Sequence, residues 1–242
     1  MPNVPNYQEL ARQYGFAPPP ESVSRLTQLV ARQDSDLDEV AKVISKDPAM
    51  RARLLRVANP KAETEADYTV DTVEGALMRN GIGCAILLAM GTPLALALAK
   101  TFQTMLSLKL DTIAPQAAPG LEGEHLLGTI AFAGKALGQV YLRLSVDSAR
   151  QIASTVLGLD PKDLGAAETS DAVGELLNII TGNFKSSLCD AGLDCRLQTP
   201  QVRCTTDLRT PTIPGGGLER MAFQSGQIVI LVDVTVNPWN GD

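Results

Sequence analysis

The most informative stretch of the chain is DAVGELLNIITGNFKSSL, which runs from Asp171 to Leu188. Apolar residues recur along it at the spacing of one helix face: Val173, Leu176, Leu177, Ile180, Phe184 and Leu188. This pattern predicts a long amphipathic helix from about Thr169 to Ala191, with Gly192 as its C-cap. The apolar stripe is the face that we expect to be buried.

A second face of the same helix carries polar and small residues: Asp171, Glu175, Asn178, Gly182 and Lys185. Asp171 and Glu175 repel each other as like charges one turn apart. Asn178 and Gly182 have low helix propensity. The face is either solvated and without function, or it docks another protein. In the second case Glu175 can pair with a partner's cation, Asn178 can orient a water for attack, and Gly182 lets a second backbone come close.

The sequence on either side of this helix contains strand-like runs separated by turn residues. Strands are predicted at 128–133, 139–145, 193–199, 201–208, 221–224 and 228–236. One further helix is expected at 148–157, ended by Gly158. The resulting order, β-β-α-α-β-β-β-β, predicts an α/β or α+β layer fold for the second half of the chain.

The first half has helical periodicity, and no strand signature precedes residue 110. Four helix starts carry capping or first-turn signals: near Ser22, after Ser35 or Asp36, at Asp47-Pro48, and after Thr72. The segment 111–124, DTIAPQAAPGLEGE, is rich in Pro, Gly and Ala and indicates a linker. We therefore predict an all-helical domain of short helices at 1–110 and a second domain at 125–242.

One uncharged stretch, Gly81–Ala99, reaches the length of a membrane-span candidate. It has no Trp or Tyr at either edge to mark a membrane interface. Inside it, Gly91-Thr92-Pro93 has the pattern of a helix end followed by an N-cap and a first-turn proline. We therefore expect two short core helices in a protein that does not cross a membrane.

Composition argues against several classes of protein. The formal net charge is −6 and aromatic residues make up 4% of the chain, which argues against binding nucleic acid through basic surface or base stacking. The single histidine, His125, does not meet the needs of most metal hydrolases and is expected to be a loop or strand-start residue. Four cysteines without C-x-x-C spacing, and an N-terminus without a signal-peptide pattern, predict a reduced, cytoplasmic protein without a metal site.

The second half resembles the CheX-like members of the CheC/CheX/FliY phosphatase family over about residues 120–237. The likeness rests on Asp171-x-x-x-Glu175-x-x-Asn178, followed at a distance by Pro200, and on GTIAFAGKALGQVYLRLS and DSARQIASTVLG upstream. The spacing from Asn178 to Pro200 is one residue shorter than the family pattern. The resemblance implies an α/β layer domain in which a sheet packs against two helices.

The resemblance also implies an activity, which is hydrolysis of the aspartyl phosphate on CheY-like receiver domains. It implies that Glu175 pairs with the receiver's active-site lysine and that Asn178 holds the attacking water in the receiver's site. Asp171, Gly182 and Lys185 would contact the partner. The receiver supplies Mg²⁺ and the phosphoryl group, so this chain is expected to need no cofactor. Proteins of this type also pair as homodimers through sheet edges, which we expect here.

The first half resembles the beginning of an HDOD (HD-related output) domain over about residues 15–105. The distinctive piece is KDPAMRARLLRVAN at 46–59, flanked by FAPPPESVSRLTQLV and TVEGALMRNGIGCAILLAM. The second, HD-like half of that family and its His-Asp metal dyad are not recognisable, so the resemblance implies a regulatory or docking module. An alternative function therefore stays open: a non-catalytic dimeric signalling adaptor that binds receivers or other signalling proteins.

Overall fold

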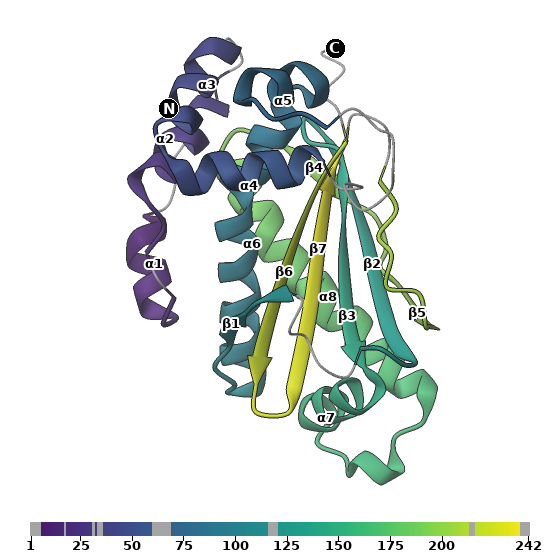
Figure 1. Cartoon of the computed structure of the whole chain (residues 1–242). Coiled ribbons are helices and arrows are strands. Elements are labelled where there is room, and N and C mark those ends of the chain that lie inside the picture. The colour runs from purple at the N-terminus through teal and green to yellow at the C-terminus, as the bar shows by residue number, and fades with distance from the viewer. Residues whose placement is uncertain are drawn as a thin grey trace.

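The computed structural model describes residues 6–16, 18–30, 32, 36–59, 69–115, 121–212 and 216–237, with the side chain of Cys84 outside the description. The predicted cap at Ser35 and part of the predicted linker lie outside the described residues. The first half is helical, and the second half combines an antiparallel sheet with helices (Figure 1). The predicted α+β class with an all-helical N-terminal region is therefore confirmed.

The described part of the first half contains α1 (Tyr7–Gln13), α2 (Glu21–Val30), α3 (Leu37–Ser45), α4 (Pro48–Ala58), α5 (Val73–Asn80) and α6 (Ile82–Leu106). The sequence did not predict α1. Three predicted caps are confirmed, because the side chains of Asp36, Asp47 and Thr72 accept backbone N–H groups of the first turn at 3.0 to 3.1 Å. Each bond satisfies a donor that a helix leaves unpaired at its start.

The sheet has the order β1-β6-β7-β3-β2-β4, with β5 also paired to β2, and every pairing is antiparallel. The strands are β1 (Asp111–Ile113), β2 (His125–Gly134), β3 (Gly138–Ser145), β4 (Cys195–Leu197), β5 (Gln201–Thr205), β6 (Gly217–Ser225) and β7 (Ile228–Val236). Between β3 and β4 lie α7 (Val146–Leu157), the 3-10 helix η2 (Pro161–Asp163) and α8 (Ala166–Asp190). The predicted strand and helix order is confirmed from β2 onward.

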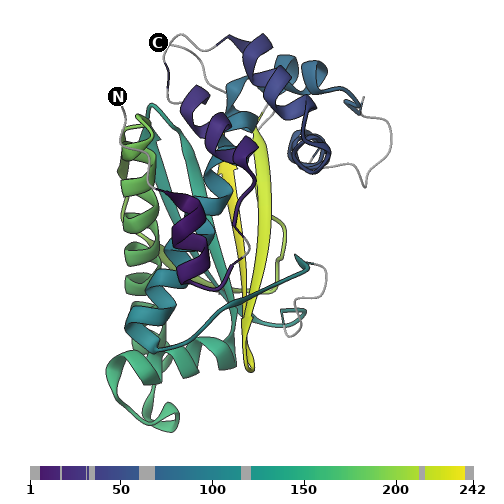
Figure 2. The same cartoon turned by 90° about the vertical axis from the view of Figure 1, so that its left-hand side faces the viewer.

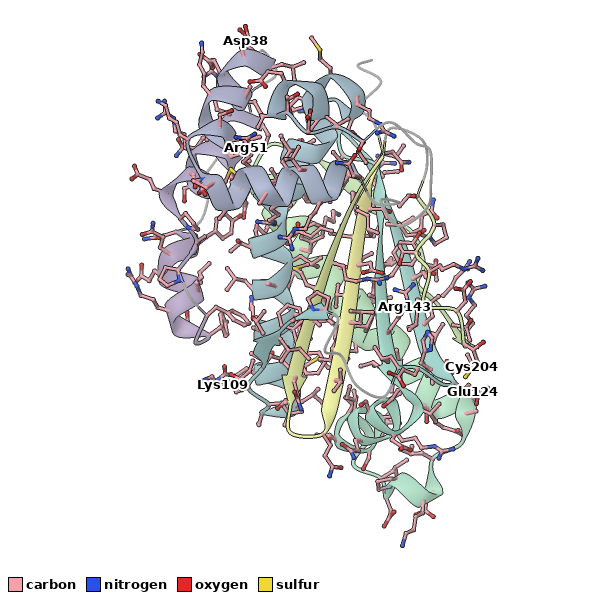
Figure 3. The ribbon with its side chains drawn as sticks, viewed as in Figure 1. Asp38, Arg51, Lys109, Glu124, Arg143 and Cys204 are labelled. Carbon is pink, nitrogen blue, oxygen red and sulfur yellow. The ribbon has the colours of Figure 1, made fainter. Side chains whose placement is uncertain are left out.

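Helices α6, α7 and α8 cover one face of the sheet (Figure 2). Alternate residues of the central strands point into the layer between them, such as Val140, Leu142 and Leu144 of β3, which are almost fully buried. The opposite face holds a buried ion pair, in which Arg143 Nη1 donates to Asp233 Oδ2 at 2.7 Å. Figure 3 labels Arg143 among the sheet strands. The main hydrophobic core of the second half therefore lies between the sheet and these helices.

Helix α6 runs without interruption through Gly91-Thr92-Pro93, so the predicted division of this stretch into two short helices is wrong. The helix packs against α2, α4 and α5, and also against α8, β6 and β7. Burial from several directions offsets the cost of glycine and proline in a helix interior. By length and composition Ala85–Leu106 could cross a membrane, but its most apolar window is 83% buried, as in the core helix of a soluble protein.

A single buried cluster crosses from the helical half to the sheet half. It joins Leu26 of α2 and Ile44 of α3 to Val173 of α8 and Val232 of β7. Within the predicted linker, Asp111–Ile113 pairs with β6 as strand β1. The division into two domains stays a prediction, whereas packing between the two halves is a feature of the fold.

Candidate functional site

Helix α8 carries the candidate site, and its buried stripe fixes how it lies on the sheet. All six predicted stripe residues are buried, none more than 1% exposed: Val173, Leu176, Leu177, Ile180, Phe184 and Leu188. The helix begins about one turn earlier than predicted, at Ala166, and Gly192 follows its end with a φ of +77°. A helix held by six buried side chains presents its opposite face in a defined orientation.

The opposite face exposes the two side chains that the sequence singles out as catalytic. Glu175 and Asn178 are both exposed, as is Asp171 one turn before Glu175. The three-residue step from Glu175 to Asn178 separates them by about 4.5 Å along the helix axis and keeps them on the same side. Within the described part of the chain, no hydrogen bond or ion pair engages the side chain of either residue. A carboxylate and a carboxamide are thus both available to a partner.

Gly182 and Lys185 have different surroundings. A Cβ placed on Gly182 would meet no atom within 4 Å, so the surface above it is open. Lys185 is half-buried and lies near β4. Burial raises the pKa of the Cys195 thiol to about 11, and the positive charge of Lys185 opposes that rise. The open face therefore includes Gly182 and the three exposed residues, whereas Lys185 is half-buried on a helix that packs against β4.

Neighbouring elements hold α8 on two sides, through contacts that the sequence did not predict. A Cβ on Gly174 would lie 3.5 Å from Val202 of β5, so α8 and β5 approach closely there. On the other side, Asn183 Nδ2 of α8 donates to Thr101 Oγ1 of α6 at 3.3 Å. Both contacts join residues far apart in the chain, and no local pattern in the sequence pairs them.

The remaining candidate residues have structural surroundings. His125 begins β2, as predicted, and is fully buried, with its Nδ1 3.0 Å from Gly123 O. Pro200 lies between β4 and β5. Among the described residues, no group of three or more His, Cys, Asp or Glu side chains could hold a metal ion. The open face of α8 is therefore the candidate site.

Comparison with known proteins relates both halves of the chain to families. Residues 126–214 match the family model described as chemotaxis phosphatase CheX, and residues 16–112 match that of the HDOD domain. No curated protein matches the chain. The second half is therefore CheX-like and the first half HDOD-like, as the sequence motifs indicate.

Solved structures of chemotaxis proteins share this fold. Chemotaxis protein CheX from Vibrio vulnificus is 27% identical with a TM-score of 0.51, and the match covers 96% of it and 61% of this chain. CheX from Desulfovibrio desulfuricans is 18% identical, with a TM-score of 0.52 over 99% of it and 61% of this chain. A CheC-like superfamily protein from Shewanella sp. PV-4 is 22% identical, with a TM-score of 0.52 over 97% of it and 61% of this chain.

The likeness to the Vibrio vulnificus protein extends ahead of strand β2. The match covers 61% of the 242 residues of this chain, which is about 148 residues. The segment from His125 to Asp242 has only 118 residues. The match therefore includes part of the chain before His125. Strand β1, which ends at Ile113, and helix α6 come before that residue in the chain. Strand β1 pairs with β6 in the sheet, and α6 packs against β6 and β7.

Proposed function

We propose that this chain removes the phosphoryl group from the aspartyl phosphate of a CheY-like receiver domain. The proposal rests on the exposure of Glu175 and Asn178 one turn apart on α8, inside the region that matches the CheX phosphatase model. The receiver partner, its phosphorylated state and the activity are parts of this proposal. Homodimerisation, a cytoplasmic location and independence of any cofactor held by this chain belong to it as well.

Hydrolysis of an aspartyl phosphate needs a water in line with the bond that breaks. The water oxygen attacks phosphorus, the bond between phosphorus and the aspartyl oxygen breaks, and inorganic phosphate and a free carboxylate are formed. The carboxamide of Asn178 can accept a hydrogen bond from this water through Oδ1 and donate to a phosphoryl oxygen through Nδ2. Positioning of this kind contributes about 100-fold or more to a rate.

Glu175 has its role in docking. Its carboxylate is exposed, so it can pair with a receiver lysine when the interface forms. A hydrogen bond to a charged group that loses water on docking contributes about 1.5–3 kcal/mol. The open surface above Gly182 admits a partner backbone, and Asp171 continues the acidic edge of the same face.

The metal ion in this proposal belongs to the receiver. Mg²⁺ bound there neutralises charge that develops on the phosphoryl group. This chain contributes a carboxylate and a carboxamide on a helix whose opposite face is buried. Because that burial fixes the backbone positions of both residues before docking, only their side-chain rotamers need to be ordered when the receiver binds.

The test measures the loss of aspartyl phosphate from receivers encoded near this gene. Each receiver is phosphorylated with a small phosphodonor and mixed with the wild-type chain, Glu175→Ala, Asn178→Ala or Gln151→Ala. The last variant is the control, since it removes an exposed carboxamide from α7. We expect Asn178→Ala to lose about 100-fold of the acceleration while it still binds the receiver, and Glu175→Ala to bind more weakly.

Two results would contradict the proposal. Equal acceleration by wild type and Asn178→Ala would remove this side chain from the mechanism. Binding of phosphorylated receivers without any acceleration by the wild-type chain would instead support a non-catalytic adaptor.

A further inference from the structure

Two helices of the HDOD-like half, α2 and α3, line a common hollow with the same residue spacing. In each helix the lining residues follow the spacing i, i+3, i+4 and i+7, and the last one lies just beyond the helix end. From α2 they are Arg25, Gln28, Leu29 and Arg32. From α3 they are Glu39, Lys42, Val43 and Lys46. These eight residues line one hollow of about 420 Å³. Small-molecule sites have volumes of roughly 300–1,000 Å³.

The hollow has an excess of positive charge. Among the described lining residues four are cations and one, Glu39, is a carboxylate, which pairs with Arg32 at 3.6 Å. Among the described residues no ion pair engages Arg25, Lys42 or Lys46, and all three are exposed. The chain as a whole has a net charge of −6, so this surface is opposite in sign to the rest of the molecule.

The hollow also has an apolar part. Leu29 and Val43, one from each helix, line it while they belong to the buried core. Gln28 adds an exposed carboxamide. Cations around an apolar base suit a ligand that combines phosphate groups with a less polar portion.

Acidic residues lie close in sequence to both ends of the hollow. Asp36 and Asp38 are at the start of α3, next to Glu39, and Asp38 lies at the outer end of that helix (Figure 3). Glu21 is in the first turn of α2, and Asp47 follows the other end of α3. A long polyanion such as nucleic acid would extend from the cations toward these carboxylates, whereas a small ligand would not.

We propose that the hollow between α2 and α3 binds a small, multiply phosphorylated molecule. Its phosphate groups would take hydrogen bonds and charge from Arg25 on one helix and from Lys42 and Lys46 on the other. The hollow and the open face of α8 share no residue. The proposal therefore holds whether or not the chain is a phosphatase.

The test titrates inorganic tripolyphosphate and ATP into the full chain by calorimetry at low salt. The double variant Lys42→Gln/Lys46→Gln removes two cations from the hollow. Its matched control, Arg150→Gln/Lys162→Gln, removes the same charge from exposed positions on α7 and η2. We expect saturable binding of at least one probe by the wild type and the control, and about tenfold weaker binding by the hollow variant.

Arg25→Gln changes the other helix and should weaken binding as well, so the result does not depend on one variant. Circular dichroism of each variant checks that the helices are intact. Equal weakening in both double variants would show non-specific attraction and overturn the proposal, as would the absence of saturable binding of either probe. Tighter binding of an oligoglutamate peptide than of tripolyphosphate would reassign the hollow to an acidic protein segment.

Discussion

Arg53 of α4 and Glu219 of β6 form a bidentate ion pair that joins the helical half to the sheet. Arg53 Nε donates to Glu219 Oε1 at 2.5 Å, and Nη2 donates to Oε2 at 2.7 Å. The two side chains are 24% and 10% exposed, so most of the pair is shielded from water. A second link, from Asn80 Nδ2 to Gly216 O at 3.1 Å, also connects the two halves.

Truncation of either partner of this pair should destabilise the protein. Arg53→Ala leaves the carboxylate of Glu219 mostly buried without its cation, and such a loss costs about 2 kcal/mol of unfolding free energy. Urea unfolding of Arg53→Ala, Glu219→Ala and the double variant measures this effect, and the double variant should lose less stability than the sum of the two single losses.

The control is Arg56→Ala, which removes an exposed arginine from the same helix and should change the free energy of unfolding by less than about 0.5 kcal/mol. Additive losses would contradict a direct pair.

Gly91 of α6 leaves room for the same ion pair. A Cβ at this position would lie 2.6 Å from Glu219 Oε2 and would also meet the guanidinium of Arg53. Alanine is otherwise the better helix residue, by about 1 kcal/mol. Gly91→Ala should therefore bring no gain in the wild-type background, but about 1 kcal/mol in the Arg53→Ala/Glu219→Ala background. Urea unfolding compares the two backgrounds, and an equal gain in both would show that the pair does not require glycine.

Gly182 should respond differently to substitution, because the surface above it is open. Gly182→Ala should stabilise α8 by up to about 1 kcal/mol in urea unfolding. Gly182→Trp should obstruct the docking face and slow receiver dephosphorylation about tenfold or more. Thr155→Trp, at an exposed position of α7, controls for the effect of a large aromatic side chain. Full activity of Gly182→Trp would place Gly182 outside the docking face.

Two cysteines should react with iodoacetamide in a fixed order. Burial raises the pKa of Cys195 to about 11, so at pH 8 its thiol is protonated as well as shielded. Cys204 is exposed, and its pKa is raised by desolvation and by the carboxylate of Glu124, which lies beside it (Figure 3). We therefore expect mass spectrometry to find Cys204 alkylated first, and Cys195 only near pH 11 or after unfolding.

The effect of Glu124 can be isolated in the same experiment. Glu124→Gln removes a negative charge that disfavours the thiolate, so it lowers the pKa of Cys204 and should speed its alkylation at pH 8. Glu122→Gln, an exposed carboxylate two residues earlier, serves as the control and should leave the rate unchanged. Equal rates in the two variants would show that Glu124 does not act on this thiol.

Helix α8 could be predicted from sequence because its signals agree with one another. The apolar stripe, the Gly192 end and the exposure of Glu175 and Asn178 all follow from the periodicity of a single long helix. The position of Lys185 could not be predicted in this way. Strand β4 is brought close to that part of the helix only by the tertiary fold, and the sequence of the helix does not indicate this neighbour.

Helix α6 shows the opposite case. Local signals at Gly91-Thr92-Pro93 point to a helix end, and only packing against both halves of the molecule overrides them. The ion pair for which Gly91 leaves room joins Arg53 to Glu219, which are 166 positions apart in the chain. Neither residue carries a motif that relates it to the other. Strand β1, with three residues, is too short for periodicity to reveal.

Because α6 is continuous, it fixes both the spacing and the relative rotation of the elements that pack along it. Each residue in an α-helix adds about 1.5 Å of length and about 100° of rotation. One residue inserted near its middle would rotate one end of the helix by more than a quarter of a circle relative to the other, so the side chains of one end would no longer face the helices and strands against which they pack. Among chains of this architecture, changes in length should therefore accumulate in the loops around α6 and spare the helix itself.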